Sequence, residues 1–115
     1  MTTNQKIIGA LKPFNRPVMP HLYDEEEEKR EKEYFTFNYA DDRAVEFADD
    51  APTHTVHYMQ IHLFLPLDVN NLKLKKEVRN ALFQAGFTYP AITMQPENNK
   101  MHIIFECEIE EERED

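Results

Sequence analysis

Residues 55 to 109 constrain the fold of this chain most, because they read as strand, helix, strand and strand in direct succession. The stretch begins with the run HYMQIHLFL at 57–65, where most odd-numbered residues are apolar and share one face. The opposite face mixes aromatic and polar side chains, those of Tyr58, Gln60, His62 and Phe64. Such a mixed face suits a surface that is covered only on assembly.

A helix is predicted over residues 72 to 85. Its apolar side chains recur at helical spacing, at Leu74, Val78, Ala81, Leu82 and Ala85. Asn70 or Asn71 is expected to cap its start, and Gly86 suits the left-handed position that follows a helix end. Lysines and an arginine occupy most of the other positions, so the helix should present a charged face to water.

Two strands are predicted after this helix, at 90–95 and 101–109. Between them, residues 96–100 have turn chemistry, since asparagine tolerates left-handed backbone angles. The last strand alternates strictly and places apolar side chains inside, those of Met101, Ile103, Phe105, Cys107 and Ile109. It places polar ones outside, those of His102, Glu106, Glu108 and Glu110. Residues 111–115 have nothing to bury, and a disordered acidic tail is expected there.

The first half of the chain is predicted to hold a short helix and two extended segments. Residues 4–12 form the helix, with Thr3 as its N-cap and Pro13 as its end. Prolines hold 18–22 extended, as an edge strand would be. A strand follows at 34–39, and 40–43 signals a turn before a long connection that reaches residue 54.

The segment 24–33 is almost entirely charged. Glu25 and Lys29 are spaced as an i, i+4 pair, so a solvated helical turn is one reading and a charged loop is the other. An acidic contact patch is a third interpretation, weaker because runs of charge are usually solvated surface.

Together these elements predict an α+β fold with the order α-β-β-α-β-β. Residues 1–110 would form a single domain, a two-layer sandwich with a four-stranded, mostly antiparallel or mixed sheet. Both helices would cover one face of that sheet. A chain of 115 residues has material for one such core and not for two.

Composition disfavours several classes of partner. The net charge is −9, with 22 acidic residues against 13 basic ones, so simple binding to phosphate backbones or anionic lipid is disfavoured. The single cysteine cannot form an internal disulfide, which fits a reducing compartment such as the cytoplasm. No apolar run approaches the ~18 residues of a membrane-spanning helix.

No pattern in the sequence indicates catalysis or a cofactor. The chain contains no serine for a nucleophilic triad, and Cys107 alternates onto the predicted core face. The five histidines include His54, His57, His62 and His102, and His102 would lie beside His62 if their strands pair. Without a His-Glu-x-x-His or Cys-x-x-Cys spacing, surface histidines explain these positions better than a metal site does. We therefore expect a protein that is not an enzyme and that holds no metal or cofactor.

Six short stretches, in this order, resemble a known family. They are ALKPFxRPV at 10–18, FNYADDR at 37–43, FADDAP at 47–52, QIHLF at 60–64, LxxAGFT at 82–88 and HIIFE at 102–106. The family is that of the small tail-completion, or tail-terminator, proteins of long-tailed phages and prophages. The resemblance covers residues 7 to 110, and the glutamate-rich stretch 25–33 departs from it.

The resemblance implies an α+β protomer that closes into a ring, in most members a hexamer. Such a ring caps the last layer of the tail tube and presents a surface to the head connector, first in the host cytoplasm and then in the virion. An acidic lumen would let DNA pass without sticking, and we hypothesise that some of Asp41, Asp42, Asp49 and Asp50 line it or meet the tube. Three alternatives stay open: another head–tail joining protein (a connector or stopper), a monomeric α+β adaptor or regulatory module, and a metal-dependent enzyme, which elemental analysis of the purified protein would test.

Overall fold

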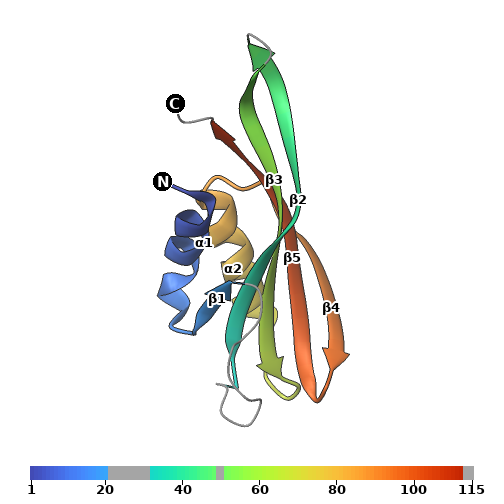
Figure 1. The fold of residues 1–115 in the computed structure, drawn as a ribbon. Helices are drawn as coiled ribbons and strands as arrows, with labels where there is room; N and C mark the ends of the chain where they lie inside the picture. Colours follow the sequence, from blue (N-terminus) through green and yellow to red (C-terminus); the bar gives the residue numbers. More distant parts are fainter. Residues whose placement is uncertain (21–31, 49–50, 113–115) are drawn as a thin grey trace.

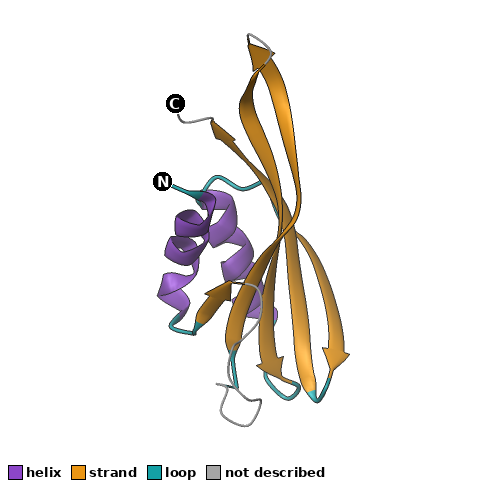
Figure 2. Ribbon diagram, viewed as in Figure 1, coloured by secondary structure: helices purple, strands orange, loops and turns teal. Residues whose placement is uncertain are grey.

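The computed structural model describes residues 1–20, 32–48 and 51–112. Two helices pack on one face of a five-stranded sheet (Figures 1 and 2). The elements follow in the order α1 (Thr3–Leu11), the 3₁₀ turn η1 (Lys12–Phe14), β1 (Val18–Pro20), β2 (Tyr34–Ala48), β3 (Ala51–Pro66), α2 (Leu72–Gln84), β4 (Ala91–Glu97) and β5 (Lys100–Glu112).

The strand order in the sheet is β1-β2-β3-β5-β4, and only β1 runs parallel to its neighbour. The predicted α+β class is confirmed, but the predicted count of four strands is wrong. The fifth strand is β1, whose Val18 pairs with Phe35, while the Phe35 amide donates to Pro17 O at 2.8 Å. Pro17 and Pro20 leave β1 at the sheet edge, where a missing N–H group is tolerated.

The core lies between the helices and the odd-numbered residues of β2, β3 and β5. Its completely buried members include Phe35, Ile61, Leu63, Ile103 and Phe105. The helices contribute further buried side chains to the same cluster, those of Ile7, Leu11, Val78 and Leu82. The alternation predicted for β3 and β5 is confirmed at most positions, because the core face holds the buried Met59, Ile61, Leu63, Leu65, Ile103, Phe105, Cys107 and Ile109. His57 and Met101, which were assigned to the same face, are only partly buried.

The boundaries of α2 follow from local chemistry. Its start is fixed by the Asn70 side chain, whose Oδ1 accepts from the Leu72 amide at 3.1 Å. At its end Gly86 has φ +107°, a left-handed angle that favours glycine. The amides of Gly86 and Phe87 donate back to Phe83 O and Leu82 O, which makes a Schellman motif, and the Phe87 ring is buried beneath it.

The start of α1 differs from the prediction by one residue. Thr2 is the N-cap, because its hydroxyl accepts from the Gln5 amide while the Gln5 side chain accepts from the Thr2 amide. Two of the unpaired amides at the helix start are thereby satisfied in a reciprocal capping box. Thr3, which was expected to cap the helix, is buried instead and bonds to the far end of β5. The α-helix ends at Leu11, and Pro13 lies in the 3₁₀ turn that follows.

The turn predicted at 40–43 is wrong, and so is the long connection after it. Strand β2 continues to Ala48, with a β-bulge where Tyr39 pairs with Met59 and Asp41 with Tyr58. The extra residue is Ala40, and a bulge absorbs it without ending the ladder. Residues 41–48 and 51–58 are thus paired strands, which we call the β2–β3 arm; the upper part of Figure 1 shows it extending beyond the helices.

The C-terminal strand is longer than predicted. β5 extends to Glu112, so Glu111 and Glu112 belong to the sheet and pair with Thr55 and His54, not to an acidic tail. The remaining residues of that predicted tail, 113–115, lie outside the described residues, as do 24–31 of the charged segment. Between β4 and β5 the predicted asparagine turn is confirmed, since Asn98 and Asn99 both have left-handed φ angles, of 50° and 63°.

Candidate assembly surface

No described helix lies on the sheet face turned away from α1 and α2, which we call the outer face (Figure 2). The predicted surface residues of β3 lie there together, because each alternates with a buried core residue: Tyr58, Gln60, His62 and Phe64. All four are partly exposed. The outer face nonetheless contains side chains as buried as the core, those of Tyr34, Thr36, Val56 and His102, at 4, 5, 8 and 9% exposure.

Stacked rings cross three strands of the outer face. Phe64 of β3 lies between Tyr34 of β2 and His102 of β5, with ring centroids 4.8 Å and 4.4 Å apart and nearly parallel planes. The ammonium group of Lys100 lies 5.0 Å from the Tyr34 ring centroid, in cation–π position. Offset stacking of this kind buries apolar ring surface although no second layer covers it.

A chain of hydrogen bonds, which we call the histidine network, joins four strands beside this stack. His62 Nε2 lies 2.7 Å from Asn38 Oδ1, and His62 Nδ1 lies 2.7 Å from His102 Nε2. His102 Nδ1 in turn lies 2.7 Å from Glu97 Oε2. Asn38 belongs to β2, His62 to β3, His102 to β5 and Glu97 to β4, so the network binds the strands across the outer face.

The partners determine how protons are placed in the histidine network. The Asn38 amide nitrogen donates to Gln60 Oε1 at 3.3 Å, so Asn38 Oδ1 faces His62 and accepts from its Nε2–H. His62 Nδ1 then accepts from His102, which must also donate to the Glu97 carboxylate. Both bonds of His62 are satisfied when its ring is neutral and protonated at Nε2.

The electrostatics of His62 agree with this assignment. Burial, together with the charge of His102, lowers the pKa of His62 to about 4, and the Glu97 carboxylate offsets only part of that effect. A neutral His62 therefore persists well below its usual pKa of about 6.5.

The histidines are not arranged as a metal centre. Within residues 1–20, 32–48 and 51–112, no three His, Cys, Asp or Glu side chains are placed to hold a metal ion. His62 and His102 bond to each other, and His57 lies on the opposite face. The free thiol of Cys107 is buried, and burial, with a smaller contribution from Glu108, raises its pKa to about 12. A thiol with so high a pKa is a poor nucleophile.

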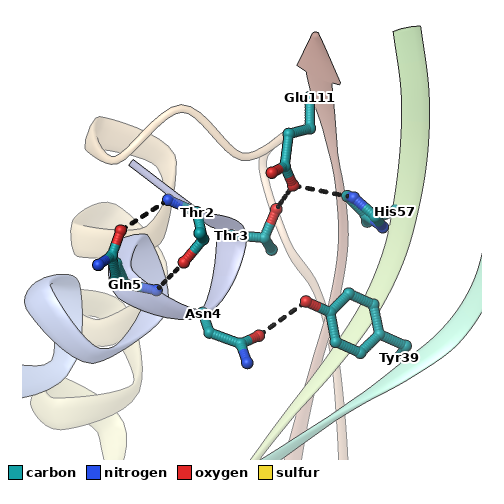
Figure 3. A network of polar contacts seen from close by, with 7 residues as sticks. All are labelled: Thr2, Thr3, Asn4, Gln5, Tyr39, His57 and Glu111. Carbon is teal, nitrogen blue, oxygen red and sulfur yellow. Dashed lines mark hydrogen bonds and ion pairs between the residues drawn. The ribbon is translucent and has the colours of Figure 1, made fainter. Parts of the chain in front are cut away.

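The face that carries the helices has its own polar cluster, which Figure 3 shows and which we call the α1 anchor. Thr3 Oγ1 donates to Glu111 Oε2 at 2.7 Å, and the same oxygen lies 2.9 Å from His57 Nε2. Tyr39 OH donates to Asn4 Oδ1 at 2.7 Å, and its ring meets His57 edge-on. The bond from Thr3 lowers the pKa of Glu111, against the opposing effect of burial, and His57 lowers it further.

The predicted acidic residues are only partly brought together. Asp41 and Asp42 lie in β2, at the base of the β2–β3 arm, opposite Tyr58 and His57 in the backbone register. Asp49 and Asp50 lie outside the described residues. The arm thus places Asp41 and Asp42 next to the predicted β3 surface, a proximity that the turn predicted at 40–43 did not anticipate.

Sequence reasoning found half of the histidine network. Alternation placed His62 and His102 on one face, and pairing of β3 with β5 brings them together as expected. It missed Asn38 and Glu97, which complete the network. The available signal was the pair Asn98-Asn99: a two-residue turn there sets Glu97 opposite Lys100, close enough to reach His102.

No protein-family model matches this sequence, and no curated protein matches it. No helix among the described residues is long and apolar enough to cross a membrane.

Proposed function

We propose that this chain is a structural protein of a long-tailed phage or prophage, a tail-completion or tail-terminator protein whose ring caps the tail tube and joins it to the head connector. The proposal starts from the resemblance of the ordered stretches between residues 7 and 110. The α+β class with two helices on one sheet face is compatible with the protomer that this resemblance implies.

The observation that carries the proposal is the outer face. A sheet face with stacked rings and a bonded histidine pair, yet without a described helix over it, presents partly exposed aromatic side chains that suit burial against a partner. Interfaces favour such aromatic side chains at their centre. Its side chains are already held by stacking and hydrogen bonds, so little further side-chain entropy would be lost when a partner docks on it.

The β2–β3 arm supports the same reading. The molecule measures 54 × 28 × 23 Å, and the arm accounts for much of its long axis (Figure 1). Beyond His54, the last residue that β5 pairs with, the arm is a two-stranded ribbon, which is marginally stable alone in water. A neighbouring subunit or the tube would supply the missing contacts along its edges.

The proposed mechanism is mechanical. The ring would cover the growing end of the tube and prevent addition of another layer, while its opposite side meets the connector. We assign no catalytic role and no cofactor to the chain. Some of Asp41, Asp42, Asp49 and Asp50 would line the lumen, where carboxylates repel the phosphates of passing DNA.

Electron microscopy tests the proposal directly. The protein alone, and mixed with tail tubes of the phage that encodes it, should give rings, and rings bound to one end of the tube. The variant Gln60→Lys/Phe64→Lys, which places two charges on the outer face, should remain folded and lose end binding. Asn80→Lys, on the exposed side of α2, is the matched control and should bind normally. A protein that never forms or end-binds rings under any condition contradicts the proposal.

A second variant tests the acidic positions. Replacing Asp41, Asp42, Asp49 and Asp50 with Asn should change tail attachment without unfolding the domain. Unchanged joining of heads to tails, at normal particle yield, would discard the assignment of these residues to the lumen or tube.

The alternatives give different results in the same preparations. A head-side connector or stopper should co-purify with DNA-filled heads and not with tubes. A monomeric adaptor or regulatory module should scatter light as a single chain at every concentration and bind neither particle.

A further inference from the structure

Helix α2 and the loop that follows it carry a partly exposed basic and aromatic surface on the helix side of the sandwich. We call it the basic patch, and its residues are Lys75, Lys76, Arg79, Phe83 and Tyr89. Phe83 and Tyr89 are 49% and 56% exposed, unusual values for aromatic side chains. Arginine and aromatic residues are the groups that most often anchor protein interfaces.

The basic patch is ordered by contacts within it. The Arg79 guanidinium lies 4.8 Å from the Tyr89 ring centroid and its Nη1 lies 3.5 Å from Tyr89 OH. Phe83 meets the same ring edge-on, with centroids 5.6 Å apart. Lys75 Nζ lies 3.2 Å from Met94 Sδ of β4. A stacked guanidinium loses less side-chain entropy on binding than a free one.

The cations of the basic patch have no carboxylate partner among the described residues. The one acidic residue of α2, Glu77, lies 3.8 Å from Lys73, on the other flank of the helix. Neither Lys75, Lys76 nor Arg79 forms an ion pair within the part of the chain that the structure describes. In a protein of net charge −9, this is an isolated area of positive charge.

The outer face carries the opposite arrangement. Glu106, Glu108 and Glu110 of β5, which we call the acidic row, are exposed and alternate with the buried Phe105, Cys107 and Ile109. Neighbours in the row are about 7 Å apart, since two strand residues span that length, so their charges repel one another. None of the three forms an ion pair with another side chain that the structure describes.

The basic patch and the acidic row form no ion pair with each other among the described residues. The patch belongs to the helix layer, whereas the row points to the outer face because its residues alternate with the core side chains of β5. The loop that carries Tyr89 borders β5, where the Thr88 amide donates to Glu108 O, yet the charged groups of the two surfaces stay unpaired. Two different, complementary surfaces on one chain are the requirement for head-to-tail contact, which closes into a ring when the rotation allows it.

We propose that the basic patch of one subunit docks on the acidic row of a second copy of this chain, so that Arg79 and the two lysines pair with its carboxylates. Phe83 and Tyr89 would pack beside them, on the apolar part of the outer face. This inference rests on the proposed ring and names the contact that would build it.

Charge reversal tests this contact by sedimentation velocity at low and high salt. Lys75→Glu/Lys76→Glu and Glu106→Lys/Glu108→Lys should each weaken self-association at least about tenfold, because like charges then face each other. Both reversals in one chain should restore it, and so should mixing the two variants. Lys73→Glu and Glu77→Lys, which change the same charges on the other flank of α2, are the controls and should associate normally.

Several outcomes separate this inference from the proposed function. If the wild type assembles but the reversals do not change it, or the combined variant is not restored, the docking contact is wrong and the ring can stand. Loss of tube binding with normal self-association would assign the basic patch to the tube and overturn the inference. If the wild type forms no ring alone or on tubes, both proposals fail.

Circular dichroism is used to check that each variant is folded before its self-association is measured. Should a reversal unfold the chain, the neutral changes Lys76→Gln and Glu108→Gln replace it, with a smaller loss of association expected from each. Wild-type assembly in both neutral variants, at all salt concentrations, would contradict the contact equally well.

Discussion

Each face of the sheet carries a polar cluster that includes histidine, and the two clusters connect different parts of the fold. On the face that bears the helices, His57 and Thr3 share the Glu111 carboxylate and tie the first helix to the last strand. On the outer face, His62 and His102 bond to each other and join four strands. The first cluster attaches one layer to another, whereas the second stiffens a single layer.

The difference teaches how a sheet face can be half-buried without a second layer. Beneath the helices, burial comes from apolar side chains such as Ile61 and Phe105, and polar groups are confined to the margin. On the outer face, rings stack on rings and polar groups satisfy one another laterally. Such a face keeps a fixed shape in water and stays available for a partner, since its hydrogen bonds need nothing from outside.

The largest difference between the faces should appear when core and outer side chains of one strand are truncated. Phe105→Ala removes a completely buried ring and should lower the free energy of unfolding by about 3–5 kcal/mol. Ile104→Ala, its neighbour on the outer face, should cost roughly 1 kcal/mol because that side chain is only partly buried. Urea unfolding followed by circular dichroism measures both. Equal losses would mean that the outer face is packed like the core.

The second effect is a pH dependence of stability that arises on the outer face, at His62. The pKa of His62 is about 4 in the folded protein and about 6.5 when unfolded, so between these values the unfolded chain binds more protons. Stability should therefore fall as pH decreases from about 6.5 to about 4, by roughly 1–2 kcal/mol because solvent screens part of the shift at this half-buried ring, and level off below. Urea midpoints across this pH range measure the slope.

Two substitutions show which histidine causes the dependence of stability on pH. His62→Gln should flatten the stability curve between about pH 6.5 and pH 4, because the titrating ring is gone. His57→Gln changes the same residue type on the other face and should leave the slope in place. A slope that survives His62→Gln, or disappears with His57→Gln, would reverse the comparison between the two clusters.

A smaller effect is expected at the α1 anchor. The pKa of Glu111 is lowered in the folded state, so its charged form stabilises the fold above the carboxyl's unfolded pKa, and this contribution is lost as pH falls through the folded value. Glu111→Gln should cost about 1 kcal/mol at neutral pH, the worth of a part-buried charged hydrogen bond, and lose less on acidification than the wild type. Glu110→Gln, an exposed neighbour, is the control for loss of charge alone; an equal cost there would dismiss the anchor.

The smallest expected effect is the slow reaction of the Cys107 thiol with thiol reagents in the folded protein. The buried Cys107 thiol has a pKa of about 12, so almost no thiolate exists at neutral or mildly alkaline pH. A thiol reagent should modify native protein only at the rate of its unfolding and label it promptly in urea. Rapid labelling of the folded protein would show that the edge of β5 beside Cys107 opens, and that this face is less closed than its core suggests.

Periodic patterns predicted the fold where each strand has one dry face. The register of Met59 to Leu65 and the stripe of Val78 and Leu82 could be predicted because burial dictates the period. The turn at 40–43 was wrong because Asp41 and Asp42 resemble turn residues, and a bulge leaves no mark in composition. The end of β5 was missed because Glu111 is held by a hydrogen bond from a residue 108 positions away, and local sequence cannot show that contact.

At the candidate assembly surface too, the face of each residue could be predicted from periodicity, whereas its partners on other strands could not. The face of Tyr58, Gln60, His62 and Phe64 could be read from alternation alone. The partners of His62 could not, because they depend on which strands lie side by side, and strand order emerges from the whole sheet. The basic patch was similarly hidden, since only the path of the loop after α2 brings the Tyr89 ring onto Arg79.

The hydrogen bond between Thr3 and Glu111 also determines when the first helix can pack during synthesis. Strand β5 lies between β3 and β4 and holds the first helix, so neither the sheet interior nor the seat of that helix exists until β5 has been synthesised as far as Glu111. At about 5–20 residues per second, the nascent helix must wait roughly 5–20 seconds for its place. A chain interrupted before Lys100 would therefore contain both helices and strands β1 to β4 without the strand that joins them.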